Sequence, residues 1–267
     1  TVPSSPQGAR RVTSKLRVAL LGTLRVTRDR TPVTGFVYRK SLALFAYLAA
    51  TGHPHDRGAL AGMLFGKSTE ANARANLRKV LVDLKRPLCS HLSITRMEVG
   101  FDTGSPYWLD VEEFERRIHQ TRDKHAVPLA RKDAAALTEA VALYRGDFLA
   151  GLCVHNAPAF EQWVLMKREH LRLQALRALD LLVDHHAALG DLTQAFTCID
   201  RLLLLEPAQE EAHRRRMALL ARSGQRVAAL RQYGTCRQAL AALDARPDQR
   251  TERAYEEIRL GGHLPST

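Results

Sequence analysis

The spacing of apolar residues changes twice within the first 110 residues, which predicts extended, helical and again extended segments. In residues 16–26 (LRVALLGTLRV), the apolar side chains of one parity follow the two-residue period of a strand: Leu16, Val18, Leu20, Leu24 and Val26. Turn residues near 31–35 indicate a second, shorter extended piece.

Apolar spacings of three and four residues then predict three helices, at about 39–51, 57–65 and 69–86. Gly52 is expected to end the first helix, and Pro54 prevents its continuation. Ser68 is the expected N-cap of the third helix, and Pro87 is expected to stop it. The third helix carries an apolar stripe of Leu77, Leu81, Leu84 and Leu88, with Val80 beside it.

Residues 93–110 (SITRMEVGFDTGSPYWLD) alternate again, with Met97, Val99 and Phe101 on one parity. Turn residues occupy 102–106 and a short return strand follows at 107–109, so we expect a β-hairpin directly after the third helix. A strand, three helices and a hairpin are the order of a winged helix-turn-helix domain, in which the last helix enters the DNA major groove. We therefore assign residues 15–110 to a winged helix-turn-helix domain.

From Val111 onward the pattern is helical throughout. Small residues recur at a 34-residue spacing, which is typical of tetratricopeptide repeats: Gly190 with Gly224, and Ala195 with Ala229. Pro207 and Pro247 are 40 residues apart and do not follow this period. We expect a mainly α protein with a small β part, in which residues 111–267 form an all-α tetratricopeptide-like domain and 1–14 a flexible leader.

Charge distinguishes the two predicted domains. The formal net charge is +12, and residues 1–110 contain 17 Lys and Arg against 7 Asp and Glu, whereas residues 111–267 contain 23 against 21. This asymmetry is the signature of a polyanion-binding domain joined to a near-neutral one. A generally basic protein would not confine the excess to one segment.

The third predicted helix presents a mixed basic face opposite its apolar stripe. This face holds Asn72, Ala75, Lys79, Val82 and Arg86, with Arg78 adjacent and Arg74 and Lys85 flanking it. Arg and Asn can read base edges by paired hydrogen bonds, and a small residue allows close approach. Lys79 and Arg86 could instead bind only phosphates. A solvated face on a core helix is the alternative, but the following hairpin and the local charge favour DNA.

Other basic or polar residues of the first domain are weaker candidates for phosphate contacts. Lys67 and Ser68 are expected to lie in the turn before the third helix. There they would be near phosphate or polymerase. The remaining candidates, each of which alone is more commonly an exposed surface residue, are Arg39, Lys40, Arg57 and Arg96.

Longer segments of the chain resemble one family. The first half contains LRVALLGTLRV, YRKSLALFAYLA and ARANLRKVLVDLKRPL, and WLDVEEFE follows at the junction. The second half contains ALYRGDFLAGL, FEQWVLMKREHLRLQALRALDLL, GDLTQAF and LEPAQEEAHRRRMALLARSGQRVAALRQY. In order and spacing, residues 16–260 resemble the SARP-type bacterial transcriptional activators (Streptomyces antibiotic regulatory proteins and their relatives), which join a winged-helix domain to a bacterial transcriptional activator domain.

The resemblance implies an activator that binds repeated elements of double-stranded DNA near promoters and contacts RNA polymerase. Its helical domain would serve regulation or self-association, such as a homodimer on DNA. Two segments depart from the family pattern. Phe65-Gly66-Lys67-Ser68 stands where relatives often carry Trp, and TGSPYW replaces a glycine-tyrosine pattern at the expected hairpin tip.

Other chemistry finds little support in the sequence. Residues 61–68 (AGMLFGKS) fit a loose nucleotide-binding pattern, but a predicted amphipathic helix replaces the strand and glycine-rich turn that a P-loop needs. The pairs His53/His55 and His185/His186 lack further metal ligands. With no nucleophile–base pair visible, we expect no enzyme activity, cofactor or metal. Scattered cysteines and the lack of a long apolar run predict a cytoplasmic protein, nucleoid-associated when bound.

Two alternatives remain at this stage. The first is a helical-repeat adaptor whose basic domain binds RNA or polyanions without sequence preference. RNA modules normally display aromatic stacking platforms, which the first half lacks, and this counts against RNA. The second is a nucleotide-dependent enzyme built on residues 61–68.

Overall fold

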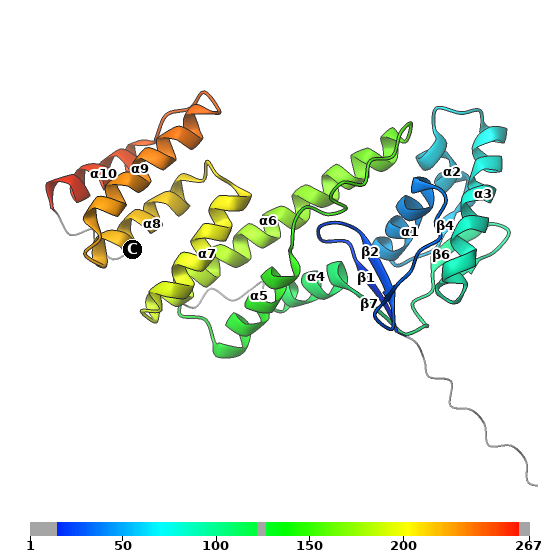
Figure 1. Cartoon of the computed structure of the whole chain (residues 1–267), viewed down its shortest axis with the longest axis horizontal. Helices are drawn as coiled ribbons and strands as arrows, with labels where there is room; N and C mark the ends of the chain where they lie inside the picture. Colours follow the sequence, from blue (N-terminus) through cyan, green and yellow to red (C-terminus); the bar gives the residue numbers. More distant parts are fainter. Residues whose placement is uncertain (1–14, 122–126, 262–267) are drawn as a thin grey trace, which may run out of the picture. The chain divides into compact units, whose positions relative to one another are not determined.

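The computed structural model describes residues 15–121 and 127–261 (Figure 1). Two compact units interleave along the sequence. Unit 1 comprises the residues up to Phe114 together with Leu143–Glu169, and unit 2 comprises Glu115–Ala142 together with the residues from His170. The predicted leader, residues 1–14, lies outside the described residues. The expected functional division at residue 110 stays a prediction, because the compact units are defined by packing alone.

The described part of unit 1 contains two small sheets and a group of three helices. Its elements are β1 (Leu16–Ala19), β2 (Arg25–Arg28), β3 (Thr31–Pro32), α1 (Arg39–Thr51), β4 (His55–Asp56), α2 (Arg57–Phe65), α3 (Glu70–Leu88), β5 (Leu92–Ile94), β6 (Glu98–Phe101), β7 (Tyr107–Leu109) and the start of α4 (Asp110–Thr121). One sheet has the order β3-β2-β1-β7, and the other has the order β4-β6-β5.

Helices α1, α2 and α3 confirm the sequence prediction, with corrections at the two ends of α3. Helix α1 ends at Gly52, which adopts a left-handed conformation (φ 68°) and donates its amide to the Leu48 carbonyl. Thr69, not Ser68, occupies the N-cap of α3, and no side chain caps that end. Pro87 lies in the last turn of α3 and does not stop it, since the helix runs one residue further.

The strands differ from the prediction in their pairing. The expected strand over 16–26 is two strands, because the chain reverses and β1 pairs antiparallel with β2. The hairpin after α3 is formed by β5 and β6, with its tip at 95–97. β7 does not return along β6; it pairs parallel with β1, so that Leu16 lies opposite Tyr107. Alternation identified these strands, but it carries no information on which strand is the partner.

Residues 145–150 belong to unit 1 because they bond to the end of β1. The Leu149 amide donates to the Leu20 carbonyl at 2.8 Å, and the Gly22 amide donates to the Asp147 carbonyl at 3.1 Å. Phe148 is fully buried. The segment ALYRGDFLAGL thus closes the N-terminal unit, although it lies more than thirty residues beyond β7.

A buried carboxylate fastens the same region. Asp110, the first residue of α4, accepts hydrogen bonds from the Leu20 amide at 2.7 Å and the Leu21 amide at 3.1 Å. Arg145 donates to Oδ2, the oxygen that also accepts the Leu21 amide, at 2.6 Å. Burial raises the pKa of Asp110, although these donors and the Arg145 charge act in the opposite direction. This side chain therefore joins β1, α4 and the 145–150 segment.

Helices make up unit 2. The described elements that follow α4 are α5 (Arg131–Leu143), α6 (Pro158–Ala188), α7 (Leu192–Leu205), α8 (Glu210–Arg222), α9 (Arg226–Ala241) and α10 (Gln249–Leu260), of which α5 and α6 also reach into unit 1. Within the described ranges, no helix is long and apolar enough to cross a membrane.

The 34-residue period corresponds to the helix pairs α7/α8 and α9/α10. Gly190 and Gly224 precede α7 and α9 with nearly equal φ angles of 73° and 74°. Ala195 and Ala229 are both completely buried where α7 and α9 pack on their neighbours. The prolines deviate from the period because α9 has 16 residues where α7 has 14, and because a longer loop follows α9.

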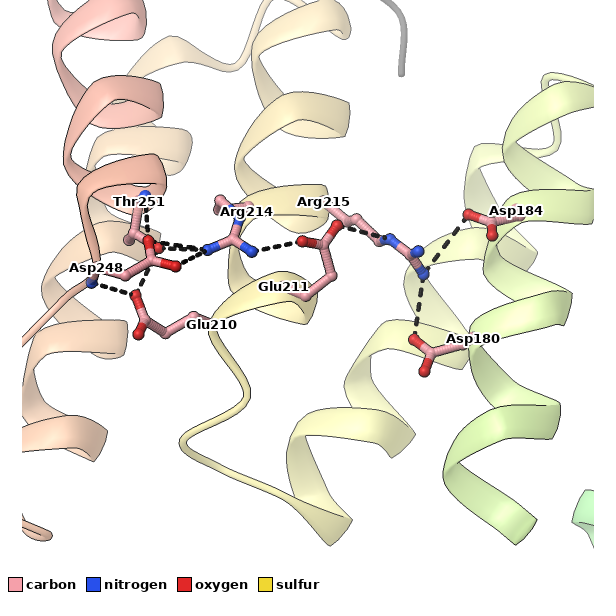
Figure 2. Close-up of polar contacts among 8 residues, drawn as sticks. All are labelled: Asp180, Asp184, Glu210, Glu211, Arg214, Arg215, Asp248 and Thr251. Carbon is pink, nitrogen blue, oxygen red and sulfur yellow. Dashed lines mark hydrogen bonds and ion pairs between the residues drawn. The ribbon is translucent and has the colours of Figure 1, made fainter. Parts of the chain in front are cut away.

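A chain of charged side chains links α6, α8 and α10 (Figure 2). Arg215 on α8 contacts Asp180 of α6 at 3.1 Å and Glu211 at 3.2 Å. Arg214 contacts Glu211 at 2.5 Å and Asp248, just before α10, at 3.1 Å. Two neighbouring arginines on α8 therefore hold α6 and the start of α10, and they share the carboxylate of Glu211.

We expect Ala229→Leu to lower the free energy of unfolding by about 1–3 kcal/mol, because a larger side chain has no space at this buried position. Chemical denaturation measures the effect. Val227→Leu on the same helix is the control, since Val227 is largely exposed. Equal stabilities of the two variants would contradict the close packing described for the repeat.

Candidate nucleic-acid interface

Helix α3 exposes the predicted basic face and buries the predicted apolar stripe. All five stripe residues are buried, among them Leu77 and Leu84. The exposed side chains are Asn72, Arg74, Arg78, Lys79, Val82, Lys85 and Arg86, and Ala75 is half-buried. Val82 is 69% exposed, so this apolar side chain lies among cations on the outer face and takes no part in the core.

The cations of this face are weakly neutralised. Arg74 pairs with Glu70 one turn earlier at 2.5 Å, and both side chains are mostly exposed. Exposed pairs of this kind contribute little and are readily exchanged for another anion. Across the part of the chain that the structure describes, Arg78, Lys79 and Lys85 have no carboxylate partner. The face therefore presents a positive surface to solvent.

One buried carboxylate on α3 fixes the helix against α1. Asp83 accepts hydrogen bonds from the Val37 amide at 3.1 Å, the Tyr38 amide at 3.2 Å and the Ser41 hydroxyl at 2.6 Å. Tyr38 occupies the N-cap of α1 without a side-chain cap, and Asp83 holds the backbone that leads into the helix. Burial alone would raise the pKa of Asp83, but these hydrogen bonds and nearby Arg86 outweigh it and lower the pKa.

The hairpin tip lies beside the start of α2. Arg57 donates its guanidinium to the Thr95 carbonyl at 3.0 Å and its amide to the Met97 carbonyl at 2.9 Å. Thr95 closes the turn by accepting the Glu98 amide at 2.9 Å. Arg96 and Met97 project from this tip, and Met97 is 68% exposed. Residues 102–106, where the tip was expected, instead lead to β7, so that expectation was wrong.

A family profile matches most of the second half of the chain. The bacterial transcriptional activator domain is matched by residues 109–259, which is more than half of the protein. The chain belongs to this bacterial transcriptional activator family. The predicted SARP-type family membership is thereby confirmed. None of the curated proteins matches the chain.

A solved structure supports the fold of this regulator over nearly its whole length. It is described as Mycobacterium tuberculosis EmbR in complex with low affinity phosphopeptide. The TM-score is 0.68 at 19% sequence identity, and the match covers 94% of this chain and 67% of that one. The predicted combination of a winged-helix part and a helical-repeat part is confirmed.

Three side chains that were predicted to contact phosphate donate hydrogen bonds to backbone carbonyls of the protein itself. Lys40 donates its ammonium to the Leu64 carbonyl at 2.6 Å and lies 4.2 Å from the centre of the Phe65 ring. Burial lowers the pKa of Lys40. Arg39 donates to the Gly151 carbonyl at 2.9 Å, and Arg57 supports the hairpin tip. These roles depend on contacts distant in sequence, so no local pattern indicated them.

The turn before α3 leaves its polar residues open to solvent. Lys67 and Ser68 are exposed, and the Ser68 amide donates to the Phe65 carbonyl at 2.8 Å. Residues 61–65 of the nucleotide-binding pattern lie within helix α2. A cleft of about 330 Å³ that the sequence did not indicate adjoins α3, and Tyr38, Asn76 and Lys79 contribute to its walls. Asn76 belongs with the candidate interface, because it adjoins Lys79 in this cleft.

The histidine pairs gather no further metal ligands in the described ranges, where no group of three His, Cys, Asp or Glu side chains could hold a metal ion. His55 instead contacts the Thr51 hydroxyl at 2.8 Å. His185 is buried near the end of α6. Both histidines therefore have packing roles in this regulator.

Proposed function

We propose that this protein is a sequence-specific double-stranded DNA-binding transcriptional activator. Helix α3 would enter the major groove, and the β5–β6 tip would contact the phosphate backbone or minor groove. The observation that carries the proposal is the exposed face of α3, which holds three cations without a carboxylate partner among the described residues and an exposed amide, Asn72. Its apolar stripe and Asp83 hold the helix firmly, as a reading element requires.

The proposal assigns distinct tasks to the side chains of this face. Arg78 and Asn72 would read base edges, since their side chains can form paired hydrogen bonds. Lys79, Lys85 and Arg86 would neutralise phosphates, with Arg96 at the hairpin tip. The helical repeat would serve self-association or contact with RNA polymerase in the cytoplasm. Membership in the activator family supports this second assignment.

A competition between DNA fragments tests the proposal. Affinity is measured for fragments of the upstream promoter region and for random duplex of equal length, across a salt series. We expect one fragment to bind tighter by orders of magnitude and to keep its advantage at higher salt. Arg78→Ala is expected to weaken the affinity for that fragment about 5- to 150-fold, since an arginine paired with a base contributes roughly 1–3 kcal/mol.

Matched variants separate base reading from phosphate binding. Lys85→Ala should weaken all duplexes alike and reduce the salt slope by about 1. Arg231→Ala is the control, because Arg231 is exposed on α9 of unit 2 and does not belong to the winged-helix elements. Equal binding of all duplexes, lost with salt, would show a polyanion anchor and favour the adaptor function instead.

A further inference from the structure

Unit 2 contains a cleft that the DNA-binding proposal does not use. It lies between the end of α4, the middle of α5 and the second half of α6, which are drawn in green in Figure 1. Its volume is about 630 Å³. Clefts of roughly 300–1,000 Å³ are the size that encloses a small organic ligand.

The floor of the cleft is apolar. Leu137 of α5 and Ala178 of α6 are buried there, and Ile118 of α4 and Leu181 of α6 are partly buried. Leu173 lies at the cleft with 41% of its surface exposed. These side chains would gain by covering an apolar ligand body, because burial of apolar surface is favourable.

The polar groups of the cleft include one arginine and two histidines. Arg177 of α6 is exposed and has no ion pair among the residues that the structure describes. His119 and His170 line the same cleft, and His170 lies 3.7 Å from Glu115. The lining carboxylate, Asp180, contacts Arg215 of α8 at 3.1 Å, outside the cleft lining (Figure 2). Arg177 is therefore available to an external anion.

Gln174 adds an unsatisfied hydrogen-bonding group. Its amide nitrogen lies 3.0 Å from the His170 ring, but its buried side-chain oxygen has no partner among the described residues. A buried polar atom without a partner costs free energy, and rotation of the Gln174 side chain toward a ligand in the cleft would relieve that cost. If the oxygen and nitrogen of this amide were exchanged, the nitrogen would occupy the same buried position. One atom of the amide therefore lacks a hydrogen-bond partner in either orientation.

We propose that this cleft binds a small amphipathic carboxylate. The carboxylate pairs with Arg177, the apolar body covers Leu137, Ala178 and Leu181, and a hydroxyl or amide of the ligand bonds Gln174. The site would give the helical domain a means of sensing a small molecule. It depends on residues of α4, α5 and α6 only, so its test is independent of DNA binding.

The experiment uses the full chain and the fluorescent anion 8-anilinonaphthalene-1-sulfonate. We expect saturable binding at one site, displaced by octanoate and not by octylamine, because only the carboxylate pairs with Arg177. Arg177→Gln should weaken octanoate binding about tenfold or more, as loss of a charge-assisted hydrogen bond predicts. Leu173→Gln should also weaken it, and this exposed position leaves folding intact.

Two control variants test whether the effect is local. Arg231→Gln removes an exposed arginine from α9, and Lys79→Gln changes the other cleft, beside α3. Both should bind octanoate like the unmodified protein. Octanoate binding that is unchanged in Arg177→Gln, equal displacement by octylamine, or failure of the folded protein to bind the fluorescent anion would each overturn the proposal.

Discussion

Asp110→Ala is expected to lower the free energy of unfolding by about 3 kcal/mol, because it leaves two buried amides without an acceptor. Those amides belong to Leu20 and Leu21, and both residues are completely buried. Water cannot easily replace the lost carboxylate there. Arg145 contributes less to the loss, because its side chain is about half exposed. Urea denaturation at neutral pH measures the difference.

Asp147→Ala is the matched control for this substitution. Asp147 lies in the same segment and is exposed, and among the described residues its side chain accepts a single long hydrogen bond, of 3.3 Å from Tyr144. We expect this variant to lose less than about 1 kcal/mol. If Asp110→Ala lowered the free energy of unfolding by no more than this control, Asp110 would not hold β1 and the 145–150 segment together.

Asp83→Ala is expected to cost about 2–3 kcal/mol, because the Ser41 hydroxyl and the amides of Val37 and Tyr38 lose their shared acceptor. Thermal unfolding followed by circular dichroism measures this loss. Lys85→Ala on the same helix is the control, because Lys85 is exposed and should change stability by less than about 0.5 kcal/mol.

The stabilisation by Asp83 should also depend on pH. Its pKa is lowered in the folded protein, so its contribution is present above the unfolded-state pKa of about 3.9. The contribution is lost as the pH falls through the lower, folded-state pKa. The stability difference between the unmodified protein and Asp83→Asn should therefore shrink below about pH 4. A difference that grows with acidity would contradict the assigned hydrogen bonds.

Periodicity predicted the helices well because helical burial repeats locally. The stripe from Leu77 to Leu88 defined both faces of α3, and Gly52 marked the end of α1. Strand pairing was not predictable in the same way, because the partner of a strand is set by distant residues. β7 pairs with β1 across about ninety residues of sequence. The same limit explains why the expected hairpin tip at 102–106 was wrong.

The candidate interface was predictable in outline but not in its supporting contacts. Exposure of Arg78 and Lys79 follows from the helical period alone. By contrast, Lys40 and Arg57 point to backbone carbonyls of other elements, which no local pattern encodes. The segment ALYRGDFLAGL was among those that resemble the family, but the sequence did not indicate its structural role. The structure supplies the reason, because Arg145 bonds Asp110 and Phe148 is buried in unit 1.

The bonding of residues 145–150 to the end of β1 has a consequence for synthesis on the ribosome. Phe148 and Leu149 complete unit 1, and Trp163 contacts Tyr47 of α1 with ring centres 4.8 Å apart. Part of the core of unit 1 therefore stays exposed while α4 and α5 are translated. This takes seconds at about 5–20 residues per second. Unit 1 thus reaches its final form only after part of the region that matches the activator domain has been made.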